Sequence, residues 1–484
     1  MTKKNYLDIA LLMGITLLLF FPLFYTHYFY TDEINQLWFY RKDDSFHMFI
    51  PQGRYLTDRL LAALFRSIST ISQINRLHIF SLLGWMACIP VWYLILEKVT
   101  RREQLPPILP FFAVLYLVAC PPFTIYVSWA STMELFIANT AGLIAGYLLY
   151  TQIKWVDGRM QLSTGAILST ILFGLIALFT YQNGFGCFLL PFLLQLISKK
   201  KLTRPLVIAL VFYFFIFLVY FMLFHWQMKE LHMDTSSRTG LATNPVRKIL
   251  FFFGFPLAGA FRFTWIVNEW SRDPKIISLL VFAGYIALNA FRVRYLSIVL
   301  CLLILCYLPS LVVSENYASN RTMLALDMAV FVLVFTTLLQ WIGKERRQRL
   351  IACCVGVLLV INAWYNFHYQ FLGPVTNEYV RVRNYLDTQY RPDITSVCFI
   401  RPSEELFRHK YGINISWDEF GVPSNSREWV PEFFVRQVVL EKTGSRAAAD
   451  SLVIKNWKDR AAWEQSDTTA SPHTLVVDVE KILQ

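Results

Sequence analysis

Charged residues are scarce in this chain of 484 residues. They make up 16% of it, against about a quarter in typical soluble domains, while hydrophobic residues make up 56%. The mean hydropathy is +0.44. Long apolar runs recur from one end to the other. This pattern excludes an ordinary soluble protein and predicts a mainly α-helical protein that crosses a membrane many times.

Cysteine patterns typical of metal sites and disulfide frameworks are also missing. Seven of the eight cysteines lie in or beside apolar runs, and only Cys398 lies in a polar segment. None belongs to a Cys-x-x-Cys spacing or to a Cys/His cluster, so they predict no metal site. The first apolar run ends without a small-residue cleavage site, and we expect it to stay in the protein as a helix.

Basic residues gather in short clusters between the apolar runs. The tail from Phe371 onward has 14 Lys and Arg and 16 Asp and Glu, which leaves 31 basic and 17 acidic residues before it. Such an excess beside membrane helices reports orientation and requires no nucleic-acid partner. With about eleven crossings, every basic cluster falls on the cytoplasmic side. These clusters are 3–4, 98–102, 154–159, 199–204, 292–294 and 344–349.

Residues 1–370 are therefore predicted to form a transmembrane domain of about eleven helices, with the N-terminus in the cytoplasm. Two long loops are expected on the external face. The first, 27–74, contains a helix at 52–69 with one polar and one apolar side, which suits the membrane surface. The second, 225–275, contains apolar stretches that suit the same interface.

Residues 371–484 are predicted to form a small soluble α/β domain on the external face. The segments 396–400 and 475–479 have the composition of short buried strands, and 431–442 and 446–450 that of helices. The tail contains no glycine-rich phosphate loop, no GxSxG and no metal-ligand spacing.

Adjacent carboxylates, Asp32 and Glu33, stand just after the first apolar run. At an external membrane interface, a carboxylate can act as a general base, or can hold a divalent cation that neutralises a leaving phosphate. The pair could therefore hold a Mg²⁺ or Mn²⁺ ion, and the sequence indicates no definite cofactor. The alternative is that Thr31 or Asp32 only caps the helix that begins at Glu33.

Four arginines in the predicted external segments are candidates for holding a phosphate: Arg54, Arg238, Arg262 and Arg321. Arg54 opens the interfacial helix, where its side chain would alternatively reach toward lipid headgroups. Arg321 begins a helix, and a cation is poorly placed at that end. Its position therefore predicts an anionic partner.

Four further polar residues could line a substrate cavity. Tyr181 and Gln182 interrupt an apolar run, and an interrupted helix at this depth needs protein or a cavity around it. A tight helical hairpin is the alternative for that break. Glu315 lies in the turn before Arg321, and Glu134 near the outer end of another run. Ser131 and Glu134 also fit a capping box.

Several of these features together resemble a known class. The topology, an external loop with an acidic pair and an interfacial helix are similar to the GT-C class of integral membrane glycosyltransferases. Short motifs narrow the resemblance to the bacterial O-antigen glucosyltransferase (serotype-conversion) family: Thr31-Asp32-Glu33, Gln52-Gly53-Arg54-Tyr55-Leu56, Tyr181-Gln182 and Glu315 with Arg321. That family usually has two aspartates where this chain has Asp32 and Glu33. The resemblance covers residues 1–370.

The resemblance implies an activity. A sugar would move from a polyprenyl-phosphate carrier to a glycan or lipid-linked acceptor on the outer face of the bacterial cytoplasmic (inner) membrane. Asp32 or Glu33 would act as the base and the arginines would stabilise the leaving phosphate. With no second carboxylate evident as a nucleophile, inversion is expected at the anomeric carbon.

Two other classes compete with this interpretation. A polysaccharide or lipid-carrier transporter or flippase often has matching broken helices in its two halves, and the sequence suggests one break, at 181–184, without a counterpart. An O-antigen ligase or polymerase would need similar arginines. It would not need an acidic pair directly after the first helix.

Overall fold

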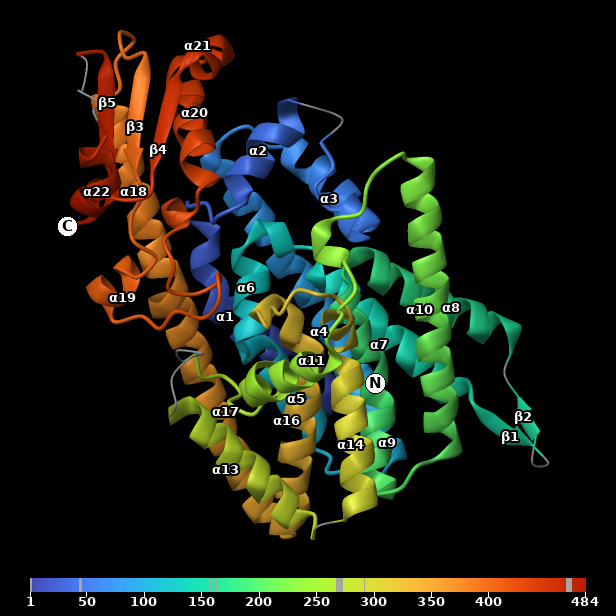
Figure 1. Cartoon of the computed structure of the whole chain (residues 1–484). Coiled ribbons are helices and arrows are strands. Elements are labelled where there is room, and N and C mark those ends of the chain that lie inside the picture. The colour runs from blue at the N-terminus through green and yellow to red at the C-terminus, as the bar shows by residue number, and fades with distance from the viewer. Residues whose placement is uncertain are drawn as a thin grey trace.

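The computed structural model describes residues 2–42, 46–156, 159–161, 163–266, 273–290, 292–466 and 472–484. These residues are mostly helical, with a small three-stranded sheet near the C-terminus and a short hairpin, β1 (Lys154–Val156) and β2 (Arg159–Gln161). A helical bundle makes up most of the molecule, and the C-terminal tail lies at its upper left in Figure 1. The division of the chain at residue 370 into two domains stays a prediction.

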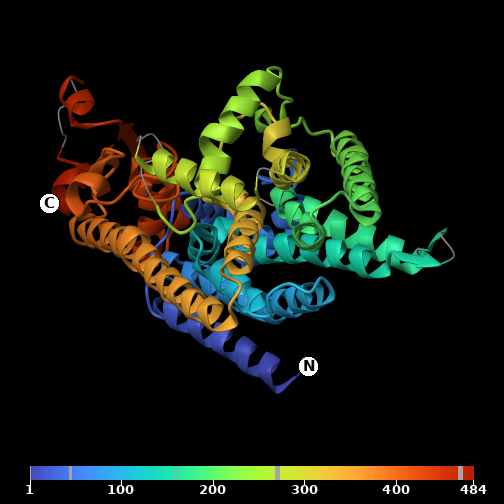
Figure 2. The same ribbon diagram turned by 90° about the horizontal axis from the view of Figure 1, so that it is seen from below.

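Several long apolar helices make this chain a multi-pass membrane protein. Among the described residues, six helices are long and apolar enough to cross a membrane. They are α1 (Lys3–Phe20), α4 (Asn75–Arg102), α7 (Leu135–Gln152), α10 (Arg204–Glu230), α16 (Asn320–Ile342) and α17 (Glu345–Tyr365). A seventh span is formed if α5 (Leu109–Ala119) and α6 (Pro121–Ser128), bent by 53°, count as one. Seen from below, α1 and α17 lie side by side at one edge of the bundle (Figure 2).

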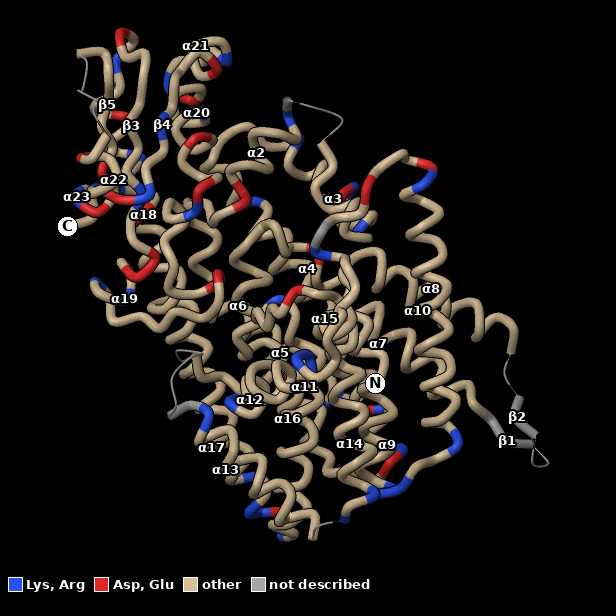
Figure 3. Tube along the Cα trace, in the orientation of Figure 1, with Lys and Arg blue, Asp and Glu red and all other residues tan. Residues whose placement is uncertain are grey.

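Shorter helices lie over other apolar runs: α8 (Thr164–Thr180), α9 (Leu190–Lys199), α13 (Asp273–Leu288) and α14 (Val293–Cys306). The apolar runs of the sequence are therefore helical. The number of about eleven crossings stays a prediction. Lys and Arg gather in the turns at the lower end of the bundle in Figure 3, including those between α9 and α10 and between α16 and α17. This placement follows the clustering expected from the sequence.

The predicted break after Thr180 is present. Tyr181 is extended, and the 3₁₀ helix η5 (Gln182–Leu189) follows. The broken segment packs closely against α7, because glycines on that helix admit its backbone. A Cβ at Gly142 would lie 2.4 Å from the Gly184 carbonyl oxygen, and one at Gly146 would lie 2.1 Å from that of Phe188.

A second break was not predicted. Residues 296–313 form one apolar run in the sequence, but the structure divides it at Tyr307 into α14 and the short helix α15 (Leu308–Val312). Leu308-Pro309 explains it, since proline at the second position starts a new helix and cannot continue the old one. The two breaks meet: Asn183 Nδ2 donates to Ser310 Oγ at 2.7 Å. The second half of the chain thus does contain a broken helix.

The first external loop contains α2 (Glu33–Lys42), η2 (Ile50–Gln52), α3 (Tyr55–Arg66) and η3 (Ile71–Ile74). Leu56 on α3 is exposed to the outside of the bundle, as expected of an interfacial helix. Asp58 belongs to the polar side of this helix, which was expected to face outward, but it is fully buried. Its carboxylate accepts hydrogen bonds from Phe49 N at 3.0 Å and His47 Nδ1 at 2.9 Å, and so holds the loop before the helix.

The second external loop begins beyond α10 and contains η6 (Ser237–Thr239), α11 (Pro245–Phe252), the π-helix η7 (Phe253–Leu257) and α12 (Ala258–Ala260). Residues 267–272 of this loop lie outside the described residues. The loop touches two others: Ser236 N donates to Pro51 O at 2.9 Å, and Ala242 N donates to Val312 O at 2.8 Å. The polar segments thus meet at one end of the bundle.

In the tail, the predicted strands and helices are present. The parallel sheet has the order β4-β3-β5, with β3 (Ser396–Ile400) central between β4 (Val453–Trp457) and β5 (Thr474–Asp478). Around it lie α19 (Leu406–Tyr411), η9 (Ser424–Ser426), α20 (Val430–Thr443), α21 (Arg446–Ser451), α22 (Arg460–Glu464) and α23 (Val479–Leu483). Strand β4 was not predicted, and its partly exposed edge position explains its weaker apolar pattern.

The tail is joined to the bundle in two ways. Helix α17 continues through the π-helix η8 (Asn366–Leu372) into α18 (Gly373–Gln389), across the boundary expected at 370. Helix α20 also contacts the first external loop, where Glu441 Oε1 accepts from Ile71 N at 2.7 Å. The Arg446 guanidinium lies 3.6 Å from the centre of the Trp38 ring. The tail is therefore held against the acidic loop.

Candidate active site

Asp32 lies at the junction of the first loop and the tail. The residue before it, Thr31, has a φ of +40°, a strained conformation for a β-branched residue and one often found at functional sites. Trp429 Nε1 donates to Asp32 Oδ1 at 2.8 Å. Among the described residues, Oδ2 has no hydrogen-bond partner. One carboxylate oxygen is thus fixed, while the other is available to a substrate.

Asp32 feels charges of both signs, from three arginines and from Asp418. Burial raises the pKa of its carboxyl group above the ordinary value. The Arg321, Arg238 and Arg427 guanidiniums and the Trp429 hydrogen bond oppose that shift in part. A carboxylate with a raised pKa is a stronger base at neutral pH than an ordinary aspartate. Two of the four arginines predicted to hold a phosphate, Arg321 and Arg238, are in this group.

Glu33 points the other way. It is fully buried, and its two oxygens accept hydrogen bonds from Tyr30 N at 2.6 Å, from His78 Nε2 at 2.8 Å and from Ala130 N. These partners occupy both oxygens and tie the loop to α4 and to the turn before α7. The adjacent carboxylates serve different neighbours, which favours Asp32 over Glu33 as the reactive group.

The described residues hold no group of three or more His, Cys, Asp or Glu side chains placed to bind a metal ion. With Glu33 turned inward, the two carboxylates also do not form a chelating pair. The Mg²⁺ or Mn²⁺ ion suggested for Asp32 and Glu33 stays a prediction.

Arg321 has the anionic partners that its position at the start of α16 led us to expect. Its side chain lies 3.5 Å from Asp418 Oδ2 and 3.7 Å from Glu419 Oε1, both in the tail. The guanidinium lies 4.7 Å from the centre of the Trp129 ring and donates to the Tyr317 hydroxyl at 2.9 Å. The cation is thus held in place between acidic and aromatic groups.

Asp418 and Glu419 were not among the site residues predicted from the sequence. Glu419 is fully buried and caps α16, accepting from Asn320 N at 2.6 Å and Arg321 N at 3.2 Å. Burial raises the pKa of both carboxyl groups, and repulsion from Glu419 and Asp32 adds to the effect at Asp418. A signal was available: Trp417-Asp418-Glu419-Phe420 is a second Asp-Glu pair, flanked by aromatic residues.

Two of the motifs behind the family resemblance meet in space. Arg54 Nε donates to Gln182 Oε1 at 3.3 Å, and the guanidinium lies 4.1 Å from the centre of the Tyr181 ring. Gln182 Nε2 in turn donates to Gln52 O at 2.7 Å and to the Tyr220 hydroxyl at 2.8 Å. The broken helix therefore positions the arginine that opens α3.

Glu134 lies beneath this assembly. It is buried, and its Oε1 accepts from the Thr57 hydroxyl at 3.2 Å, while Oε2 has no hydrogen-bond partner within the described residues. The expected capping box with Ser131 is absent: the side chain of Glu134 makes no capping bond, and the Ser131 hydroxyl donates to Gln36 Oε1. The carboxylate turns away from the helix end toward the loop and Arg54.

The two remaining candidate residues, Arg262 and Glu315, lie at the edge of the site. Arg262 is buried and lines a small cavity together with Ala318 and Asn320, residues of the turn that leads to Arg321. Glu315 is exposed, and its backbone carbonyl oxygen accepts from Lys248 Nζ at 2.7 Å. Arg262 therefore adjoins the Arg321 turn, whereas the Glu315 side chain points away from the core of the site.

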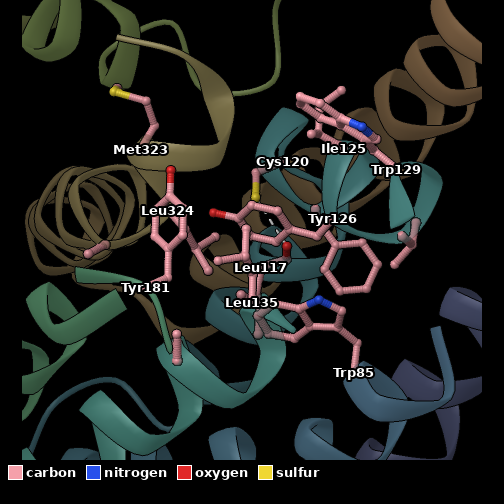
Figure 4. Close-up of a cluster of buried hydrophobic side chains, with 14 of the residues drawn as sticks. Trp85, Leu117, Cys120, Ile125, Tyr126, Trp129, Leu135, Tyr181, Met323 and Leu324 are labelled. Atoms are coloured by element: carbon pink, nitrogen blue, oxygen red, sulfur yellow. Dashed lines mark hydrogen bonds between the residues drawn. The ribbon is translucent and has the colours of Figure 1, made fainter. Parts of the chain in front are cut away.

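Buried aromatic side chains pack beneath the site. Tyr126 stacks on Trp85, with ring centroids 5.7 Å apart and planes 5° apart, and its hydroxyl donates to Arg321 O at 3.2 Å. Figure 4 shows Tyr126 between Trp85 and Tyr181, with Trp129 above it. Buried side chains thus support the polar groups from below and restrict their movement.

Sequence comparisons identify no family for this chain. It matches no known protein-family model, and no curated protein is significantly similar to it in sequence. The class defined by the structure is a multi-pass helical membrane protein with a polar site at one end of its bundle.

Proposed function

We propose that this protein is a membrane glycosyltransferase. It moves a sugar from a polyprenyl-phosphate carrier to an envelope glycan or lipid-linked acceptor on the outer face of a bacterial cytoplasmic membrane. One observation carries the proposal: Asp32 is a carboxylate with one unbonded oxygen, and the charges of Arg321, Arg238 and Arg427 act on it. A base beside several cations is what attack on a sugar phosphate requires.

In the proposed reaction, an acceptor hydroxyl gives its proton to Asp32 Oδ2 as its oxygen attacks the anomeric carbon. The bond from that carbon to the phosphate oxygen breaks, and the electron pair leaves with the polyprenyl phosphate. Arg321 and Arg238 stabilise the charge that develops on the phosphate. Attack from the face opposite the leaving group inverts the anomeric centre. The Tyr317 ring, which lies beside Arg321 and is partly exposed, offers an apolar face to the sugar.

The test is sugar transfer by the purified chain with a polyprenyl-phosphate sugar donor. Asp32→Asn removes the base, so we expect the transfer rate to fall by about 10²-fold or more. Glu345→Gln, a charge change at an exposed position of α17, is the matched control and should keep the wild-type rate. Full transfer by Asp32→Asn would overturn the proposal.

The second broken helix favours an alternative function, that of a transporter or flippase. The breaks at Tyr181 and Tyr307 lie in different halves of the chain and meet at Asn183 and Ser310, as the broken helices of many transporters do. A transporter or flippase would move the lipid-linked substrate across proteoliposomes without forming a glycosidic bond. Movement of an intact fluorescent lipid-linked sugar by both wild type and Asp32→Asn, with no transfer by either, would establish that rival.

A further inference from the structure

A basic pocket lies at the end of the bundle opposite the Asp32 site. Helix α4 begins near that site, where His78 bonds to Glu33, and its 28 residues extend about 42 Å to the other end. There, between the ends of α4 and α7, is a pocket of about 300 Å³. Its lining is Lys98, Arg101, Arg102, Tyr147, Tyr150 and Thr151.

The lining contains three cations and no carboxylate. Two of the cations lie over aromatic rings: the Arg102 guanidinium is 4.7 Å from the Tyr150 ring centre, and Lys98 Nζ is 5.9 Å from that of Tyr147. Arg101 reaches Glu97 only at 3.9 Å on the exposed surface, a weak pair. Most of the positive charge is therefore left for an anion.

The pocket is held rigid from below. The Tyr150 hydroxyl donates to Glu103 Oε1 at 2.6 Å, and Lys199 Nζ lies 3.5 Å from Glu103 Oε2. Arg102 also donates to Tyr150 O at 3.4 Å. Glu103 is buried and committed to these partners, so it anchors the tyrosine without neutralising the pocket. A preorganised cluster loses less entropy when an anion binds.

We propose that this pocket binds a phosphate group, that of the headgroup of an anionic membrane lipid. A phosphate oxygen takes charge-assisted hydrogen bonds from Arg102, Arg101 and Lys98, and the tyrosine rings contact the glycerol carbons. The volume suits a headgroup, and the acyl chains lie along the apolar surface of α4 and α7. Basic pockets between helices at this level of a membrane favour such lipids. The inference is independent of the proposed transferase activity.

The experiment measures thermal unfolding of the full chain in neutral detergent, with phosphatidylglycerol, phosphatidylcholine or inorganic phosphate added. Phosphatidylglycerol should raise the Tm, and phosphatidylcholine should not. In the Lys98→Gln/Arg102→Gln variant, we expect the apparent affinity for phosphatidylglycerol to fall about tenfold or more. Glutamine keeps the helix propensity. The Tm without added lipid reports whether the variant is folded.

Lys344→Gln/Arg346→Gln is the matched control, because both side chains are exposed at the same end of the bundle but do not line the pocket. It should bind phosphatidylglycerol as wild type does. If inorganic phosphate alone raises the Tm as much as the lipid, the site is supported and its ligand is a free phosphate. An equal loss in both double variants, or no loss in either, would overturn the proposal.

Discussion

Asp32 and Glu33 are neighbours in the chain with opposite surroundings. Asp32 has one hydrogen bond, from Trp429, and cations around it. Glu33 has three bonds from buried donors. The sequence can place an acidic pair after the first helix, but cannot say which member turns inward. That choice depends on His78 and Ala130, which are 45 and 97 residues away.

This difference predicts opposite responses to mutation. Glu33→Gln puts an NH₂ group in front of a buried donor, so we expect the free energy of unfolding to fall by about 1–3 kcal/mol. Asp32→Asn keeps an acceptor for Trp429 and relieves a buried charge, so the stability should stay near wild type. Thermal unfolding followed by tryptophan fluorescence measures both. A stable Glu33→Gln with an unstable Asp32→Asn would contradict these assigned roles.

At the scale of elements, the sequence predicted where helices occur better than how they end. The apolar runs locate the spans, and the change to polar residues located the break at Tyr181. The break at Tyr307 was missed because an apolar run continues on both sides of it, and hydropathy does not register a turn. The contact between Arg54 and Gln182 was also out of reach, since it joins segments 128 residues apart.

Substitution of Gly53 tests the packing between the first external loop and the helices around the break at Tyr181. Its φ is +76°, and an added Cβ would lie 2.1 Å from the Tyr220 hydroxyl oxygen. Gly53→Ala should therefore lower the stability by about 1–2 kcal/mol from the backbone alone, and more from the clash. Tyr220→Phe removes the clashing oxygen, so the double variant should be less destabilised than the sum of the single ones.

Gly284→Ala is the control for this series. No atom lies within 4 Å of the added Cβ, and Gly284 lies inside α13. Alanine there should leave the stability unchanged or raise it slightly. Purely additive effects at Gly53 and Tyr220 would show that the two groups are not in contact in solution.

For the whole molecule, the placement of charged residues along the sequence was the most informative pattern. It separated a basic end from a polar end, and the two lie at opposite ends of the bundle (Figure 3). It could not show that the tail contributes Asp418, Glu419 and Trp429 to the same site as Asp32. No periodicity or hydropathy pattern encodes a contact between side chains 397 residues apart, such as the Trp429–Asp32 bond.

The predicted orientation can be checked with single cysteines. Lys410→Cys in the tail and Lys344→Cys before α17 are both at exposed positions. In spheroplasts, a membrane-impermeant maleimide should label Lys410→Cys, and should label Lys344→Cys only after the membrane is opened. The wild-type chain shows the background from its own cysteines. The reverse pattern would place the tail in the cytoplasm.

The continuous helical run from Glu345 to Gln389 connects lipid and site in a direct way. Helices α17 and α18 are joined by the π-helix η8 without a loop, so the tail is rigidly connected to a membrane helix. Hydrocarbon thickness influences the tilt of such a helix. We therefore expect a change in bilayer thickness to be transmitted through α18 to the tail, and with it to the side chains that face Asp32.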